Sequence, residues 1–344
     1  MEKLLEKCTA GETMKIWYDA CTGKHVRYGV AIAKRLRAHG HEVIVTTRKH
    51  PDTLPVANFL NEKVIVVGKY DPKSLLSRLK AGVHRQLLFC RIFGKSPPDI
   101  AISHGSVDQM RVAFGLRIPT ITTVDTPYAE AVHRLTLPLA DYIVTSKAIP
   151  EKTLQVYNVK GKMIRFDGVD EVAWISGFKP LVKYDFGRPL IVVRELEEKA
   201  VYAGKGFSSV ALAKKLTCLG IVVFLSRYRR RPIKSLIVPE GFVDSASLVA
   251  QADLFIGAGG TITREAALQG TPAIVVDVFK KQYVNDYLAE KGFPIFKAKL
   301  ASVFKLAKRV LGCRTDVGDL LAKLENPVDV IANVVKRVEA KGKP

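Results

Sequence analysis

The stretch GAGGTITREAALQGTPAIVV, residues 257–276, contains the unit from which the whole chain is built. It follows the apolar run ADLFI and ends in a second apolar run, and both runs are typical of buried strands. Between them lie a turn with three glycines and a helix that begins at Thr261 or Thr263 and ends at Gly270. Strand, glycine turn, helix and strand in this order predict a parallel βαβ unit.

This unit also has the layout of a phosphate site. Gly259 and Gly260 let a ligand approach the backbone, and the first free N–H groups of the helix, at Thr261 and Thr263, point toward it. Glu265, in the first helical turn, is placed to accept hydrogen bonds from ribose hydroxyls. The alternative is a βαβ turn without a ligand, because glycine-rich turns are common in α/β folds.

Apolar strands and amphipathic helices alternate along the rest of the chain, and residues 72–95 predict a long basic helix. Residues 167–188 lack this periodicity and are interpreted as an interdomain linker. We therefore expect an α/β protein with two Rossmann-like doubly wound domains that face a cleft. The predicted segments are a polar N-terminal extension, two domains, the linker between them and a C-terminal amphipathic helix: 1–13, 14–166, 167–188, 189–325 and 326–344.

Composition narrows the class of protein. The 344 residues are 48% hydrophobic, enough for two cores, and no apolar run approaches the ~20 residues of a membrane-spanning helix. The first residues lack the apolar segment of a signal peptide, so a cytoplasmic protein is expected. Five scattered cysteines form no CxxC pair, which argues against a structural zinc site or a disulfide framework. No metal and no cofactor are expected.

The net charge of +21 favours anionic partners. Residues 1–180 hold 27 Lys and Arg against 17 Asp and Glu, and the rest holds 27 against 16, so the charge is spread over both halves. Nucleotides, acidic lipid at the inner membrane face and nucleic acid all fit such a field. The run SRYRRRP (residues 226–232) is either a phosphate patch or a solvated loop. Nucleic acid is the least favoured partner, because aromatics are few near this run and no RNA-binding signature is present.

Polar residues follow the first predicted strand, in the sequence DACTGKH. His25 is a candidate general base for a hydroxyl nucleophile, and Lys24 is a candidate phosphate ligand. In the alternative interpretation Thr22 only caps the following helix and His25 lies on the surface. The residues expected here on the acceptor side of the cleft, besides the base, are Asp19, Thr22, Gly23 and Lys24.

Other predicted strands end in polar residues that should reach the same cleft. Asp125 closes a strand and is a second candidate base. Arg194 ends the first strand of the second domain, where it could pair with a pyrophosphate or form an interdomain salt bridge. A further polar turn, expected to bind sugar hydroxyls or a phosphate, consists of Ser103, His104, Gly105 and Ser106.

The motif GAGGTITREAALQGTP resembles the donor-nucleotide motif of glycosyltransferases with the two-domain B-type fold, most closely that of the lipid-II-forming N-acetylglucosaminyltransferases. The resemblance implies a ribose-binding role for Glu265 and places the rest of the motif on Ala258, Gly259, Gly270 and Pro272. TGKH, residues 22–25, is similar to the TGGH loop of these enzymes, with Lys24 in place of a glycine.

The non-hydrolysing UDP-N-acetylglucosamine 2-epimerases are similar in other segments. HGS and HRLTLPLAD, at residues 104–106 and 133–141, resemble their HGD and NRxxTD segments. Ser106 stands where these enzymes have Asp, Asp125 where they have Glu, and their second catalytic His is replaced near Arg194. These substitutions make epimerisation the weaker interpretation.

The most extensive resemblance, from Met14 onward, is to the domain-of-unknown-function 354 family of archaea and bacteria, on MKIWYDA, SHGS, RVAFGLRIPTI, RLTLPLAD, DGVDEVAW and AGGTITREAALQGTPAI. It implies the B-type fold. We expect a metal-independent glycosyltransferase with a nucleotide-sugar donor on the second domain and an acceptor, lipid-linked if the basic surface holds the protein at a membrane, on the first. The alternatives are an epimerase and a non-enzymatic protein that binds nucleic acid or acidic lipid.

Overall fold

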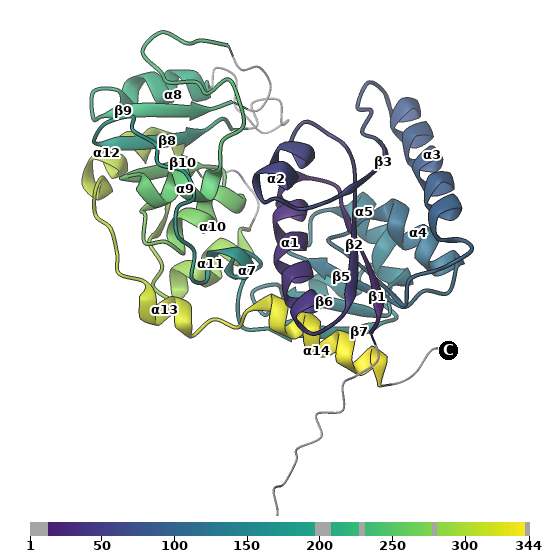
Figure 1. Ribbon diagram of the computed structural model, residues 1–344. Coiled ribbons are helices and arrows are strands. Elements are labelled where there is room, and N and C mark those ends of the chain that lie inside the picture. The colour runs from purple at the N-terminus through teal and green to yellow at the C-terminus, as the bar shows by residue number, and fades with distance from the viewer. Residues whose placement is uncertain (1–12, 197–207, 227–230, 277–280, 341–344) are drawn as a thin grey trace, which may run out of the picture.

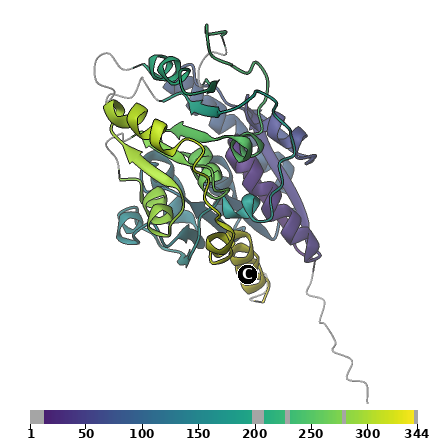
Figure 2. The same cartoon turned by 90° about the vertical axis from the view of Figure 1, so that its left-hand side faces the viewer.

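The computed structural model describes residues 13–196, 208–226, 231–276 and 281–340, which form two α/β domains side by side (Figure 1). Figure 2, seen from the side of the C-terminal domain, shows the two domains one behind the other. Each domain has a parallel sheet between layers of helices, seven-stranded in the first and five-stranded in the second. The predicted fold of two Rossmann-like domains is confirmed. Most of the N-terminal extension and of the run at residues 226–232 lies outside the described residues.

The N-terminal sheet has the order β3-β2-β1-β4-β5-β6-β7. Its strands are β1 Lys15–Ala20, β2 Glu42–Lys49, β3 Ile65–Lys69, β4 Ile100–Ser103, β5 Thr120–Val124, β6 Tyr142–Ser146 and β7 Lys162–Phe166. Its helices are α1 Gly23–Ala38, α2 Thr53–Phe59, α3 Leu75–Phe93, α4 Val107–Gly115, α5 Glu130–Thr136, a 3-10 turn Leu137–Leu139 and α6 Lys152–Gln155. A short helix, α7 Val172–Ile175, follows in the connection to the second domain.

The side chains of β1 contribute to the hydrophobic cores on both faces of the N-terminal sheet. They alternate between the two faces of the sheet, so Ile16 and Tyr18 join the core under α1, while Trp17 joins the core under α3. Trp17 packs edge-on against Phe89 with ring centroids 4.7 Å apart. The order of strands reverses between β1 and β4, and ligands of such folds bind at this point, beyond the carboxyl ends of the strands.

The C-terminal sheet has the order β12-β11-β10-β8-β9. Its strands are β8 Leu190–Arg194, β9 Ile221–Leu225, β10 Leu254–Gly257, β11 Ala273–Val276 and β12 Ile295–Ala298. Its helices are α8 Ser209–Leu216, α9 Ser245–Gln251, α10 Thr261–Ala267, α11 Tyr283–Glu290, α12 Leu300–Val310 and α13 Gly318–Ala322. The βαβ unit predicted at residues 257–276 is β10, α10 and β11, with the two strands paired in parallel.

The last helix, α14 Pro327–Glu339, returns to the N-terminal domain and packs beside α1 (Figure 1). Its buried Val328, Ile331 and Val335 belong to the same core as β1. The chain therefore crosses between the domains twice. The first crossing, predicted as a linker at 167–188, contains α7, whose Val172 and Ile175 are buried. Among the described residues, no helix has both the length and the apolar character needed to cross a bilayer.

Ile331→Val tests whether α14 is part of the N-terminal core. Ile331 is fully buried, so the loss of one methylene should lower the free energy of unfolding by about 1 kcal/mol. Urea denaturation measures this difference. Asn333→Ala, on the exposed side of the same helix, is the control and should change stability by less than ~0.5 kcal/mol. Equal effects of the two substitutions would mean that α14 does not pack as described.

Candidate functional site

A cavity of about 510 Å³ lies between the two domains, a size suited to a small-molecule ligand. The C-terminal domain contributes the end of β8, the glycine turn after β10 and the first turn of α10. The N-terminal domain contributes the first turn of α1 and residues near α2. Among the lining residues are Thr22, Gly23, Lys24, Arg27, Asp52, Arg194, Glu195, Phe242, Ser245, Gly257, Ala258, Gly260, Thr261, Thr263 and Glu265.

The two glycines of the turn before α10 differ in their surroundings, because Gly259 packs against α11 and Gly260 borders the cavity. Gly259 has φ +87°, and a Cβ there would lie 2.4 Å from Oε1 of Gln282 and 2.5 Å from Nδ2 of Asn285. Nδ2 of Asn285 also donates to the carbonyl of Gly259 at 2.8 Å. A Cβ on Gly260, in contrast, would meet no atom of the described residues within 4 Å. Gly259 is therefore required by packing, whereas Gly260 leaves the space in front of α10 open.

The N-terminus of α10 has no side-chain cap. The neighbouring cleft helices α1 and α9 are capped by Thr22 and Asp244, but the position before α10 is Gly260, which has no side chain to accept a hydrogen bond. Thr263 is only 1% exposed, and its buried hydroxyl has no hydrogen-bond partner among the residues that the structure describes. Buried polar groups normally have partners, so the start of α10 and Thr263 have hydrogen-bonding groups that the described protein residues leave unused.

Glu265 is held by one hydrogen bond on each carboxylate oxygen. Nε1 of Trp174, on α7, donates to one oxygen at 2.9 Å, and the hydroxyl of Ser245 donates to the other at 2.6 Å. Burial raises the pKa of this carboxyl, against the opposing effect of Arg27 and the two donors. Each oxygen still has a lone pair available for a ligand hydroxyl, because a carboxylate accepts up to about four hydrogen bonds.

Arg194 lies on the same cavity wall, at the end of β8. Its guanidinium donates to the carbonyls of Leu225 at 3.3 Å and Ser226 at 3.2 Å, both within its own domain. These bonds fix the side chain beside the glycine turn. Two roles were predicted for Arg194, binding of a pyrophosphate and an interdomain salt bridge. Its two hydrogen bonds to carbonyls lie within the C-terminal domain and do not decide between the two roles.

Six charged or titratable side chains meet where the domains touch, and we call them the interdomain ionic cluster. Nζ of Lys24 lies 2.5 Å from Asp125 and 2.9 Å from Asp170. Arg264, on α10, reaches across the cleft to Asp125 at 3.2 Å and to Glu171 at 2.7 Å. The sixth member is His104, whose Nε2 lies 3.2 Å from Asp125.

The charges of this cluster support one another. Burial alone would lower the pKa of Lys24, but Asp125, Asp170 and Glu171 together raise it above its ordinary value. Burial would likewise raise the pKa of Asp125, but Lys24, His104 and Arg264 hold it well below its usual range. Lys24 therefore stays charged, and Asp125 is an ionised carboxylate that is already paired.

The cluster also contains three residues whose side chains can bind metals. Ligand atoms of His104, Asp125 and Asp170 lie within 4.8 Å of one another. The ammonium group of Lys24, however, is at hydrogen-bond distance from both carboxylates. Lys24 thus supplies the cation that this donor set needs, and we assign no metal to it.

His25 lies in the first turn of α1, beside this cluster. Its Nδ1 accepts a hydrogen bond from the backbone N–H of Cys21 at 3.4 Å, and its ring meets His104 edge-on with centroids 4.7 Å apart. Burial, reinforced by His104 and Lys24, lowers the pKa of His25 well below its ordinary value. At neutral pH His25 is therefore an uncharged imidazole, whereas Asp125 is engaged by three partners.

This shift predicts how stability depends on pH. Below about pH 6.5 the unfolded chain binds a proton on His25 that the folded chain does not bind, so stability falls as the pH decreases. The contribution is at most about 1.4 kcal/mol per pH unit. In urea titrations between neutral pH and pH 5, His25→Gln should make this dependence shallower. His39→Gln, at an exposed position, is the control, and a slope unchanged by His25→Gln would contradict the burial of a neutral ring.

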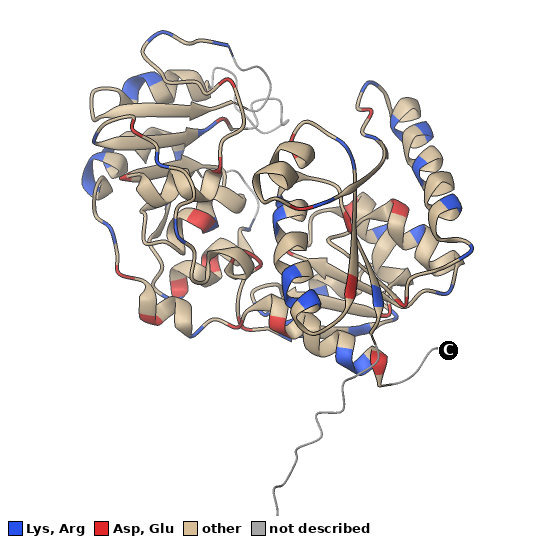
Figure 3. Ribbon diagram, in the orientation of Figure 1, with Lys and Arg blue, Asp and Glu red and all other residues tan. Residues whose placement is uncertain are grey.

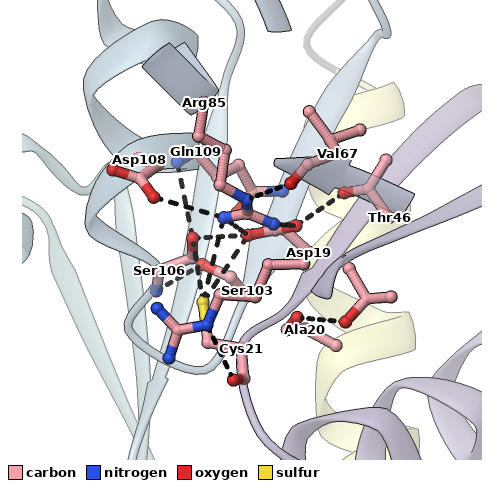
Figure 4. A network of polar contacts seen from close by, with 12 residues as sticks. Asp19, Ala20, Cys21, Thr46, Val67, Arg85, Ser103, Ser106, Asp108 and Gln109 are labelled. Carbon is pink, nitrogen blue, oxygen red and sulfur yellow. Dashed lines mark hydrogen bonds and ion pairs between the residues drawn. The ribbon is translucent and has the colours of Figure 1, made fainter. Parts of the chain in front are cut away.

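Asp19 is not among the residues that line the cavity, and it belongs to a buried polar network (Figure 4). The guanidinium of Arg85 donates to the two oxygens of Asp19 at 2.6 and 2.9 Å, and both residues are at most 1% exposed. Thr46 donates at 2.6 Å and Ser106 at 2.5 Å to the same carboxylate. The predicted contact of Asp19 with an acceptor does not agree with this position, because its oxygens are taken by protein donors.

The SHGS turn has a mixed role. Ser103 accepts from the backbone N–H of Ser106, Ser106 caps α4, and Gly105 has φ +65°. Both serines are at most 1% exposed, so they hold the turn together rather than face the cavity. His104 instead enters the interdomain ionic cluster, with Nδ1 2.6 Å from the hydroxyl of Thr123.

Four site residues were not predicted. Asp170 and Glu171 lie in the loop after β7, and a pair of acids a few residues beyond the carboxyl end of a strand in a parallel fold is a signal that could have found them. Arg264 precedes Glu265 in the motif that was singled out. Arg27, one helical turn after Lys24, pairs with Asp244 of the other domain. Their partners lie far away in the sequence, so the pairing itself could not be predicted.

A model of the family described as "Protein of unknown function (DUF354)" matches residues 14–200 and 209–340. An uncharacterised protein of Methanocaldococcus jannaschii is 30% identical over 338 residues, which cover 92% of this chain and 96% of the relative. Three solved structures have the same fold. A UDP-N-acetylglucosamine 2-epimerase from Listeria monocytogenes, described as putative, has a TM-score of 0.72 at 14% identity and covers 97% of this chain and 98% of its own. The UDP complex of MnaA from S. aureus has a TM-score of 0.70 at 16% identity and covers 96% of this chain and 99% of its own. The glycosyltransferase VinC in complex with dTDP has a TM-score of 0.61 at 12% identity and covers 96% of this chain and 100% of its own.

Proposed function

The chain belongs to the family of unknown function DUF354, and we propose that it is a metal-independent glycosyltransferase that uses a nucleotide sugar. One observation carries the proposal. The uncapped start of α10 lines a cavity between two Rossmann-like domains, together with Thr263, whose buried hydroxyl has no partner among the described residues. Backbone N–H groups at a helix N-terminus bind phosphate oxygens, and a nucleoside diphosphate supplies such oxygens together with a ribose diol.

The donor would lie along the C-terminal wall of the cavity. Its diphosphate would accept hydrogen bonds from α10 and from Thr263, and it would be close to the guanidinium of Arg194. The ribose hydroxyls would donate to Glu265, whose oxygens each hold one protein donor already. These fixed donors would stabilise the negative charge that develops on the diphosphate as it leaves, which is the largest contribution expected of such a site.

The acceptor would enter from the N-terminal wall. Its hydroxyl oxygen would form the new bond to the anomeric carbon while the bond to the diphosphate breaks, and its proton would pass to a base. His25 suits this role better than Asp125, because its ring is uncharged while Asp125 is paired with Lys24 and Arg264. Thr22 and Gly23 line the cavity beside it, and the acceptor is a lipid-linked or soluble alcohol.

A thermal-shift screen over nucleoside diphosphates and nucleotide sugars tests the proposal. A ligand at 100 times its Kd should stabilise the folded protein by about 2.7 kcal/mol, which appears as a raised Tm. Glu265→Gln should weaken binding by roughly tenfold or more, because hydrogen bonds to charged groups contribute about 1.5–3 kcal/mol. Glu290→Gln, at an exposed position on α11, is the control. The absence of a shift with every nucleotide would refute the proposal.

Epimerisation of a nucleotide sugar is the second candidate, favoured by the interdomain ionic cluster. Three carboxylates and the imidazole of His104 lie together at the cleft, and epimerisation requires groups that remove and return a proton. Incubation of UDP-N-acetylglucosamine with the protein in deuterium oxide, without any acceptor, separates the two reactions. Deuterium incorporated into the sugar ring would establish epimerisation, whereas a transferase should release the nucleoside diphosphate only when an acceptor is added.

A further inference from the structure

The outer side of α3 carries a row of exposed apolar side chains. Leu75, Leu79, Val83 and Leu87 are 81%, 65%, 56% and 49% exposed. A spacing of four residues places them one above the other on one side of a helix. Leu76, 60% exposed, widens the row, and we call these five residues the α3 stripe. Contiguous apolar surface of this kind is uncommon on soluble proteins and marks an interaction site.

The charged residues of α3 and its immediate flanks all have one sign. Residues 72–98 contain six Lys and Arg and no Asp or Glu. Arg85 is buried against Asp19, and the five others are exposed: Lys73, Arg78, Lys80, Arg91 and Lys95. Figure 3 shows the basic positions following α3 along its length. The helix therefore presents leucines flanked by cations, which is the pattern of a helix that lies in the interface of a membrane.

We propose that the α3 stripe docks this protein on the surface of an anionic lipid bilayer. The apolar side chains would enter the boundary between headgroups and acyl chains, and the flanking cations would meet lipid phosphates. α3 lies at the end of the molecule away from the C-terminal domain (Figure 1), and none of the residues that line the interdomain cavity belongs to it. The docking does not depend on the proposed transferase activity, because it uses none of the cavity residues.

A second copy of the chain fits this surface less well. Two identical copies normally associate through a two-fold contact of the same patch. Such a contact would bring the five exposed cations of each copy together without any acidic residue of residues 72–98 to balance them. Lipid phosphates supply the opposite charge, so the positive charge of α3 favours an anionic bilayer over a second copy of the chain.

Vesicle sedimentation of the full-length protein tests the electrostatic half of the proposal. The wild type should bind vesicles of equal phosphatidylcholine and phosphatidylglycerol, lose this binding at high salt, and not bind pure phosphatidylcholine. The double variant Arg78→Glu, Lys80→Glu should bind at least about 25-fold more weakly, since each cation near the surface contributes roughly fivefold. Lys308→Glu, Arg309→Glu on α12 makes the same change in net charge far from α3, and its effect should stay within about twofold because salt screens distant charges.

The apolar half is tested with Leu75→Ser, Leu79→Ser, which should weaken binding to the same vesicles by about tenfold or more. Val156→Ser, at a position that is 75% exposed outside α3, is the matched control and should have no effect. Unchanged Tm values establish that all variants fold. Equal losses for the α3 and α12 charge variants, or no loss on serine substitution, would overturn the proposal. So would a wild-type dimer in sedimentation velocity that Leu75→Ser, Leu79→Ser dissociates, since the stripe would then join two copies.

Discussion

Arg85→Met is expected to lower the free energy of unfolding by about 3–5 kcal/mol, the usual effect of breaking a buried ion pair. Arg85 and Asp19 are at most 1% exposed, so Met at position 85 leaves the carboxylate charged with only the hydroxyl donors of Thr46 and Ser106. Asp19 raises the pKa of Arg85 above its ordinary value in spite of burial, which shows how strongly the two charges interact. Urea denaturation of the full-length protein measures the loss in the free energy of unfolding.

Two further variants make this prediction specific. Arg78→Met removes an exposed arginine from the same helix and should change stability by less than ~0.5 kcal/mol. Asp19→Asn combined with Arg85→Met removes both charges and should recover part of the loss, because the unpaired carboxylate causes most of it. A loss below about 1 kcal/mol for Arg85→Met alone would contradict the buried network of Figure 4.

The second large effect is expected for Arg264→Met. Arg264 spans the cleft from α10 to Asp125 and Glu171, and burial of the pair with Glu171 means that neither charge is hydrated. Loss of the guanidinium should lower the free energy of unfolding by about 3–5 kcal/mol, or open the cleft so that Glu171 becomes hydrated. Urea denaturation detects the first outcome, and small-angle X-ray scattering detects the second as a larger radius of gyration.

Glu171→Gln combined with Arg264→Met supplies the control for this effect. The double variant should be more stable than Arg264→Met by about 0.5–3 kcal/mol, the coupling range of residues in direct contact. Arg309→Met, exposed on α12, should behave as the wild type. If Arg264→Met matched Arg309→Met in both stability and radius of gyration, the two domains would not be held together by this pair.

The fold could be predicted from the sequence because its signals are local. Each strand is a short apolar run, as in ADLFI before the glycine turn, and the alternation with helices fixes a parallel sheet. The packing of α14 could not be predicted this way. The apolar side of α14 indicates that this helix covers a core. Only the path of the chain decides that Ile331 reaches the core of β1 in the N-terminal domain rather than the core of the C-terminal domain, which precedes α14 in the sequence.

The site was predictable only where one segment contains it. The cavity wall at Gly260, Thr263 and Glu265 comes from one continuous motif, and these residues do lie together. The opposite wall depends on charge pairs between distant segments. The long basic helix predicted at residues 72–95 gave no sign that Arg85 would be buried, because the pattern does not show that its partner is Asp19.

The central claim is that the start of α10 binds the diphosphate of a nucleotide, and a crystal structure with UDP or dTDP tests it most directly. We predict the diphosphate within about 3 Å of the backbone N–H of Thr261 and of the hydroxyl of Thr263, with the ribose at Glu265. Gly260→Val should fold normally, because no described residue lies within 4 Å of a Cβ at position 260, but should exclude the nucleotide. A nucleotide bound elsewhere, with the start of α10 empty, would contradict the account.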